Sequence, residues 1–187
     1  MDKNLLKSAI INIEKNKDNN IFKTDFIELD SILKGIDTGH VIIIGGEPCM
    51  KKNSYVISIC LNLLKDNKKI CYFSLDMKRE KLITKLLLTK LKQTEIKFDN
   101  KKNTEKIARA IEFFSDKELF IEDKTNLTIE EFENGIKKHK PEVVFVDYFQ
   151  ILKIPKVPNL TEATNLAIEE IKRIAIENNT IIILVSL

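Results

Sequence analysis

The chain has 187 residues, of which 43% are hydrophobic and 32% charged. This length suits one domain with a sizeable core, and the composition is ordinary for a globular protein. The net charge is only +3, which gives little support to bulk electrostatic binding of nucleic acid. No apolar run approaches the roughly 18–20 residues of a membrane span, so we expect a soluble protein with no membrane partner.

The first twenty residues are predicted to stand apart from the rest. Residues 3–15 carry apolar side chains at near-helical spacing, and a polar run follows them. The apolar positions are Leu5, Leu6, Ile10 and Ile13. We assign residues 1–20 to an amphipathic linker helix and linker, and residues 21–187 to the globular core. A single helix cannot bury its own apolar face, so this helix is expected to dock on this domain or on another subunit.

From residue 41 onward, strand signals alternate with helical signals. Strands are expected at 41–45, 70–75, 119–122, 143–146 and 181–185. Helices are expected at 54–66, 79–92, near 105–115, from 128 onward, and at about 161–178. The strands read as continuous Ile/Val runs, which is typical of parallel strands covered on both faces. The predicted fold class is α/β, a doubly wound and mostly parallel sheet with helices on both faces.

The segment between the first strand and the first helix reads Gly-Gly-Glu-Pro-Cys-Met-Lys-Lys-Asn-Ser over residues 45–54. The phosphate-binding loop G-x-x-x-x-G-K-[ST] occupies the same place in P-loop proteins. Gly46 and Lys52 fit that pattern. Lys51, however, stands at the second glycine, and Asn53 stands at the hydroxyl residue.

These two departures bear directly on nucleotide binding. A residue other than glycine at positive φ costs about 1–2 kcal/mol. The hydroxyl at the last position normally ligates Mg²⁺, and an amide oxygen is poorly placed to replace it. The predicted nucleotide-binding residues are Gly46, Glu47, Pro48, Cys49, Met50, Lys51, Lys52 and Asn53. The alternative is a strand–turn–helix joint that holds no ligand.

Two aspartates follow other predicted strands. Asp147 ends an apolar strand, as does the Mg²⁺-orienting aspartate of P-loop enzymes, and Asp76 follows another. We expect the ends of strands 41–45, 70–75 and 143–147 to lie side by side, at the carboxyl edge where open α/β sheets bind ligands. Asp147 is the predicted metal-binding group, acting through water, and Asn53 is a doubtful second ligand.

Four blocks of sequence resemble the RecA-like C-terminal domain of DnaB-type replicative helicases, over about residues 20–187. The family motifs are T-G-F-x-x-L-D, G-R-P-S-M, F-S-L-E-M and I-D-Y-L-Q-L. The matching blocks here are Thr24-Asp25-Phe26 with Leu29-Asp30, then Gly46-Glu47-Pro48-Cys49-Met50, Phe73-Ser74-Leu75-Asp76-Met77, and Val146-Asp147-Tyr148-Phe149-Gln150-Ile151-Leu152. The resemblance implies a RecA-like P-loop fold.

The resemblance also implies a function in DNA replication and unwinding. It implies ATP and Mg²⁺ as cofactors, single-stranded DNA as a partner, and hexamers in which residues 3–15 pack on the neighbouring subunit. Asp76 takes the place of the family's water-positioning glutamate, Asp147 is the second catalytic carboxylate, and Gln150 is the motif glutamine. Three cysteines without a C-x-x-C pair fit a cytoplasmic protein with reduced thiols.

The departures from the family fall on catalytic positions. Asp76 is one methylene shorter than glutamate, Lys85 replaces an arginine, and the family glutamine after the last strand falls on Leu187. The family's arginine finger lies further downstream than Leu187. We therefore expect ATP and Mg²⁺ to be bound weakly or not at all, with hydrolysis impaired in the chain alone. An active ATP-dependent helicase motor and an interaction module that binds no nucleotide remain as alternatives.

Overall fold

A computed structural model describes residue 7 and residues 22–47, 50–96, 101–153 and 160–186. The elements, in chain order, are α2 (Ile27–Leu33), β1 (Val41–Ile44), α3 (Lys52–Lys65), β2 (Ile70–Ser74), α4 (Arg79–Leu91), α5 (Lys101–Ser115), β3 (Leu119–Glu122), α6 (Ile129–His139), β4 (Val143–Asp147), the 3-10 turn η1 (Phe149–Ile151), α7 (Leu160–Glu177) and β5 (Ile181–Val185). Residues 3–15, the predicted linker helix, lie outside the described residues except for Lys7. No helix in these ranges is long and apolar enough to span a membrane.

The five strands form one parallel sheet in the order β1-β5-β4-β2-β3. This confirms the predicted α/β class. It also corrects one expectation, because β5 lies between β1 and β4. The ends of β2 and β4 are therefore neighbours, whereas the end of β1 is one strand further away.

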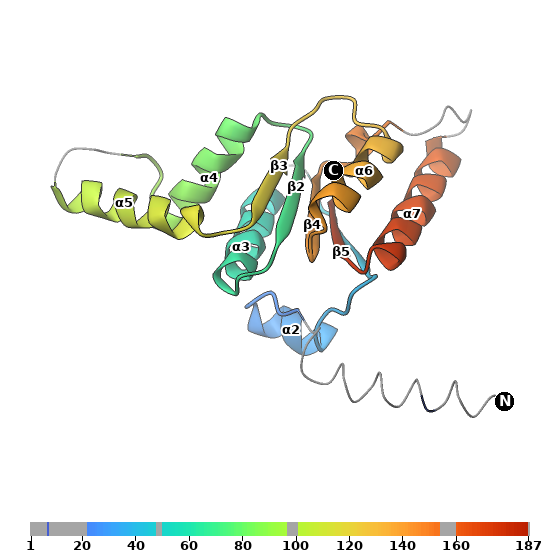
Figure 1. Ribbon diagram of the computed structural model, residues 1–187, viewed down its shortest axis with the longest axis horizontal. Helices are drawn as coiled ribbons and strands as arrows, with labels where there is room; N and C mark the ends of the chain where they lie inside the picture. The colour runs from blue at the N-terminus through green and yellow to red at the C-terminus, as the bar shows by residue number, and fades with distance from the viewer. Residues whose placement is uncertain (1–6, 8–21, 48–49, 97–100, 154–159, 187) are drawn as a thin grey trace.

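Helices cover both faces of the sheet, and successive strand residues point to opposite faces. Alternate residues of β2, β4 and β5 pack with α3 and α4 on one face: Ile70, Tyr72, Val143, Phe145, Ile181 and Ile183. The residues between them pack with α6 and α7 on the other: Cys71, Phe73, Val144, Val146, Ile182 and Leu184. Figure 1 shows α3 and α4 on one side of the sheet, α6 and α7 on the other, and α5 extending outward from α4.

The segment before β1 is tied to the rest of the domain by a local motif. The Asp30 carboxylate accepts hydrogen bonds from the backbone N–H and the hydroxyl of Thr24, both at 2.8 Å. Asn62 of α3 donates to the Thr24 carbonyl at 2.8 Å, and the Phe26 ring lies 4.6 Å from that of Tyr55. This explains the first matching block as a structural element that fastens α2 to α3.

Some boundaries differ from those expected. Helix α3 begins at Lys52 rather than at residue 54, so the lysine of the loop is already helical. Helix α5 begins at Lys101 and includes part of the polar stretch expected at 93–104. Helix α2 was not predicted as an element, because its seven residues are too few for a clear helical periodicity.

Candidate functional site

The carboxyl ends of the parallel strands lie along one edge of the sheet, and the candidate residues gather there. The loop after β1 leads into α3, Asp76 lies two residues beyond the end of β2, and Asp147 is the last residue of β4. The Asp76 backbone N–H donates to the Asp147 carbonyl at 3.2 Å. The two aspartates are therefore neighbours across adjacent strands, as their sequence positions predicted.

The loop after β1 contains a backbone conformation that normally requires glycine. Lys51 precedes α3 with φ 55° and ψ 28°, in the left-handed region. It is the position at which the P-loop pattern has its second glycine. Gly46 lies close against its own loop, because a Cβ there would be 3.4 Å from the Met50 Sδ. Pro48 and Cys49 lie outside the described residues.

The side chain of Lys52 is turned back onto the loop that carries it. The residue is buried, and its Nζ donates to the carbonyl oxygens of Gly46 and Glu47, the latter at 3.0 Å. The Lys52 ammonium, which was expected to face phosphate, thus donates to main-chain carbonyls instead. A bound phosphate would have to draw the Lys52 ammonium away from one or both of them.

Asn53, in the first turn of α3, is held by a residue from the other side of the site. Its Oδ1 accepts a hydrogen bond from the Tyr148 hydroxyl at 2.9 Å. Tyr148 follows β4 directly, so this bond joins the start of α3 to the end of β4. The amide oxygen that could replace the usual hydroxyl ligand already has a partner.

Asp147 is fully buried, with 0% of its surface exposed. Its Oδ2 accepts a hydrogen bond from the Tyr72 hydroxyl at 3.1 Å, and its Oδ1 has no partner among the described residues. Burial raises the pKa of Asp147 to about 6. The Asp76 carboxylate raises this pKa further, whereas the Tyr72 hydrogen bond and the Lys85 charge lower it.

Asp76 and Gln150 are both exposed at this edge. Gln150 Nε2 donates to the Ser186 hydroxyl at 2.7 Å, which links the turn after β4 to the residue after β5. Ser186 in turn donates its backbone N–H to the Ile44 carbonyl of β1. The edge is thus joined from β1 across β5 to β4 by polar contacts.

Tyr72 and Tyr148 contact the predicted site residues but were not predicted themselves. Tyr72 is fully buried, and its ring stacks on Phe145 with the centroids 5.4 Å apart. Strand alternation places Tyr72 on the same face as Asp147, because Tyr72 pairs with Phe145 two residues before that aspartate. Strand alternation in the sequence could have identified Tyr72 as a contact of Asp147, but only if the register of β2 against β4 had been known.

The residues at this edge fit a phosphate group better than they fit Mg²⁺. The first turn of α3 offers backbone N–H groups and the positive end of the helix dipole, and Lys51 and Lys52 add cations. Among the described residues, no three His, Cys, Asp or Glu side chains cluster as a metal site would require. Tyrosine hydroxyls already donate to Asn53 Oδ1 and to Asp147 Oδ2, and Asp147 Oδ1 is buried without a partner among the described residues.

Comparison with known proteins places this arrangement in a family. Residues 22–187 match the family described as the DnaB-like helicase C terminal domain. Among the similar proteins is the replicative DNA helicase DnaB of Helicobacter pylori, 30% identical over 159 residues that make up 80% of this chain and 32% of that protein. A probable replicative DNA helicase of Trieres chinensis is 31% identical over 173 residues, 86% of this chain and 38% of that protein. The chain thus spans about a third of the length of these relatives.

Solved structures show the same fold. A solved structure of a DnaB-like replicative helicase and its interactions with primase matches with a TM-score of 0.82 at 21% identity, over 100% of this chain and 48% of the other. A second solved structure, of an ATPase domain, matches with a TM-score of 0.83 at 23% identity, over 98% of this chain and 69% of the other. By its sequence match over residues 22–187, the chain belongs to the family of DnaB-like helicase C-terminal domains.

Proposed function

We propose that this domain is a nucleotide-binding subunit of a DNA-unwinding assembly, which binds ATP weakly and hydrolyses it poorly on its own. The observation that carries the proposal is the loop after β1. It retains the strand–loop–helix path and the lysine of a P-loop, but its side chains bond to groups within the protein. Membership of the DnaB-like helicase family supports a role in DNA replication.

Binding of phosphate is supported by the backbone. The N–H groups at the start of an α-helix are free of intrahelical partners and point along the helix dipole. Helix α3 begins at Lys52, directly after the left-handed residue Lys51, so its first N–H groups face the loop. Affinity is reduced because Lys52 must give up bonds to the Gly46 and Glu47 carbonyls before it can contact a phosphate.

Slow hydrolysis is supported by the carboxylates. Asp76 stands where the family motif has a glutamate, and a shorter side chain moves its carboxylate back by about the length of one methylene. A misplacement of about 1 Å can cost about 100-fold in rate. Asp147 is fully buried and already accepts a hydrogen bond from Tyr72, so it is poorly placed to organise the reacting groups.

The test restores the pattern and measures binding and turnover separately. Lys51→Gly with Asn53→Thr relieves the left-handed backbone at residue 51 and supplies the usual hydroxyl, although it also removes the Lys51 cation. Calorimetry with Mg-ATP should show binding strengthened by about tenfold, since a hydrogen bond to a charged group is worth that much or more. A phosphate-release assay with and without single-stranded DNA should show a smaller gain in rate.

The matched control is Asp25→Gly. Asp25 also has a positive φ, 61°, and also stands at a family glycine, but it belongs to the segment that fastens α2 to α3. It should leave ATP binding unchanged. Robust DNA-stimulated ATPase activity in the unmodified chain would overturn the proposal in favour of an active motor.

A second candidate function is an interaction module that kept the fold and binds no nucleotide. The bonds of Lys52, Asn53 and Asp147 to partners within the protein favour it, because these groups already have partners without a ligand. Calorimetry distinguishes the two functions. No heat of binding with ATP at millimolar concentration, in the unmodified chain and in the double variant, would support the module.

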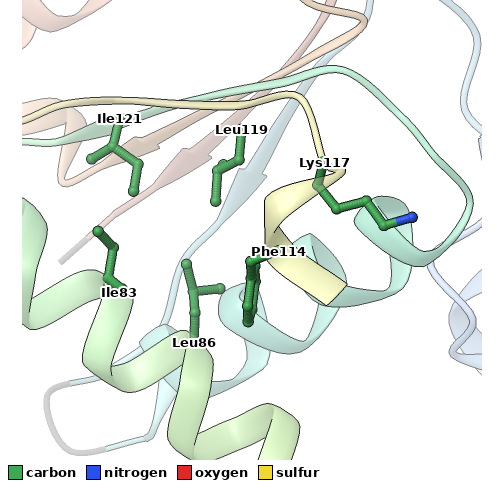
Figure 2. A pocket seen from close by; sticks show the side chains of 6 residues that line it. All are labelled: Ile83, Leu86, Phe114, Lys117, Leu119 and Ile121. Carbon is green, nitrogen blue, oxygen red and sulfur yellow. The ribbon is translucent and has the colours of Figure 1, made fainter. Parts of the chain in front are cut away.

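We further propose that the domain assembles with a second copy through residues 3–15. An apolar groove lies between α4, the end of α5 and the edge strand β3, lined by Ile83, Leu86, Phe114, Lys117, Leu119 and Ile121 (Figure 2). Ile83 is 43% exposed, and Ile111, one helical turn before Phe114, is 57% exposed. An amphipathic helix with leucine and isoleucine on one face is a suitable occupant for such a groove.

Light scattering tests this assembly. Deletion of residues 1–20 and the substitution Ile83→Lys should each shift the protein towards the monomer. Ile27→Lys is the control, because Ile27 is also exposed but lies on α2, away from the groove. A monomer in the unmodified chain, or an oligomer unchanged by the deletion, would contradict the proposed interface.

A further inference from the structure

Two tyrosine hydroxyls occupy the side-chain oxygens at which a P-loop protein normally organises its metal. Tyr72 donates to Asp147 Oδ2 at 3.1 Å, and Tyr148 donates to Asn53 Oδ1 at 2.9 Å. In P-loop enzymes the residue at the Asn53 position and the aspartate at the end of the strand hold Mg²⁺. The two hydroxyls are therefore hydrogen-bonded to the two side chains, Asp147 and Asn53, that would be expected to hold the metal.

Tyr72 cannot easily leave this position. Its side chain is completely buried, and its ring is stacked on Phe145 at an interplanar angle of 16°. Rotation of the phenol away from Asp147 would take the hydroxyl into the apolar layer between the sheet and α3. A buried hydroxyl without a partner is costly, so the Tyr72–Asp147 bond is expected to persist.

The chemistry of the donors matches what a hydrated metal supplies. A bound Mg²⁺ keeps several waters, and these waters donate O–H groups to nearby carboxylate and carbonyl oxygens. A tyrosine hydroxyl is also an O–H donor, but it is neutral and fixed to the protein. Tyr72 and Tyr148 can thus satisfy Asp147 and Asn53 as metal-bound waters would, without bringing a charge.

We propose that Tyr72 and Tyr148 take the structural place of the divalent metal, so that this site binds a nucleoside triphosphate with little contribution from Mg²⁺. Tyr72 is the principal positioning residue, because it fixes the carboxylate of Asp147. The cations for the phosphates are then Lys51 and Lys52. This inference rests on the proposed nucleotide binding for its ligand, but the tyrosine contacts themselves are testable without any nucleotide.

The first experiment therefore uses no nucleotide. Ultraviolet resonance Raman spectra of tyrosine report whether the phenol donates a hydrogen bond, and the difference between the unmodified chain and Tyr72→Phe isolates Tyr72. We expect a donating hydroxyl whose signature is unchanged by millimolar Mg²⁺. A hydroxyl released on addition of Mg²⁺ would overturn the proposal, because the metal would then displace the tyrosine.

The second experiment measures how far Mg²⁺ strengthens ATP binding. Calorimetry with ATP in EDTA and in excess Mg²⁺ gives a ratio of two dissociation constants for each variant. We expect a ratio below about threefold for the unmodified chain, since Asp147 offers the metal only one oxygen. In Tyr72→Phe the second carboxylate oxygen is freed, and the ratio should rise to about tenfold or more.

The matched control is Tyr55→Phe, which removes the remaining tyrosine hydroxyl of the chain. Tyr55 lies on α3 and packs against Phe26. The ratio of the two dissociation constants in Tyr55→Phe should therefore equal that of the unmodified chain. A purely structural role for Tyr72 would weaken binding equally with and without Mg²⁺, leaving the ratio constant, and this result would overturn the inference. If no variant binds ATP, the proposed nucleotide binding is wrong. The Raman experiment then still tests whether Mg²⁺ displaces the Tyr72 hydroxyl.

Discussion

The interior of the sheet and its carboxyl edge differ in the side chains they contain and in how these side chains interact. Strands β2, β4 and β5 are buried at every position, and their side chains are almost all apolar. At the edge, polar groups bond to one another: Lys52 to the loop carbonyls, Tyr148 to Asn53, and Tyr72 to Asp147. The interior requires only apolar side chains of suitable volume, whereas a nucleotide site requires particular atoms at particular places.

This difference explains how the family fold can coexist with unusual residues in the loop. The apolar side chains that pack between the sheet and its helices include none of the predicted nucleotide-binding residues. Substitutions at Lys51, Asn53 and Asp76 therefore leave the core intact. The predictions below test whether stability and ligand chemistry are separable in this way.

The largest effect is expected in the core. Phe132 of α6 is fully buried and lies edge-on to Phe73 of β2, with the ring centroids 4.7 Å apart. Phe132→Ala should lower the free energy of unfolding by about 3–5 kcal/mol, because it removes a large buried side chain and leaves a cavity. Urea denaturation measures this. Ile27→Ala is the control, since Ile27 is 87% exposed and its loss should change stability by less than about 0.5 kcal/mol.

A small effect of Phe132→Ala would mean that α6 does not pack on the sheet as described. A second result sharpens the comparison: ATP affinity per folded molecule should be unchanged in this variant, because Phe132 lies on the face opposite to α3. Altered affinity would show that the interior and the edge are coupled.

The fold was largely predictable from the sequence because apolar runs report burial directly. The strands from Ile70, Val143 and Ile181 were found for this reason, and their continuous runs indicated a sheet covered on both faces. The position of β5 between β1 and β4 was not found. An apolar run specifies that a strand is buried but not which strand lies beside it.

The site was predictable in part, for a related reason. Asp76 and Asp147 were correctly placed at neighbouring strand ends, since both positions follow from where the strands stop. The Tyr72 contact depends on the register of β2 against β4, which no local pattern encodes. The contacts of Lys52 depend on loop conformation, and the sequence favoured a lysine that faces phosphate.

The second prediction concerns the pH dependence of stability. Burial raises the pKa of Asp147 to about 6 in the folded protein, above an ordinary unfolded value of about 3.9. The folded state therefore holds a proton that the unfolded state loses, and this stabilisation is complete below about pH 4 and disappears as the pH rises through about 6. The shift of about two units corresponds to about 3 kcal/mol.

Asp147→Asn removes this titration. Relative to the variant, the unmodified chain should lose about 3 kcal/mol of stability between about pH 4 and about pH 7.5, because all other titrations are shared. The groups that interact with Asp147 are Tyr72, Asp76, Lys85 and Tyr148, and all of them are present in both chains. Urea denaturation at several pH values gives both curves, and parallel curves would contradict the burial of a titrating carboxyl.

The smallest effect is expected at the backbone of the loop. Lys51 has φ 55°, a conformation that costs a non-glycine residue about 1–2 kcal/mol. Glycine also loses more conformational entropy on folding, which offsets about 0.5–1 kcal/mol of the stability gained by relieving the strain. Lys51→Gly should therefore raise the free energy of unfolding by about 0.5–1 kcal/mol. A smaller increase is expected for Asp25→Gly, whose φ is 61°, because aspartate enters the left-handed region more readily than lysine and Asp25 is paired with Lys65 at 3.5 Å.

Urea denaturation of the two glycine variants side by side sharpens the comparison between scaffold and edge. If Lys51→Gly gains more stability than Asp25→Gly, Lys51 is strained in the loop, and the loop holds its left-handed turn without a ligand. If Asp25→Gly gains while Lys51→Gly does not, the strain in the loop must be offset by contacts of the Lys51 side chain itself. The loop would then be stabilised by the residue that departs from the P-loop pattern, and its shape would be a property of this chain rather than a remnant of nucleotide binding.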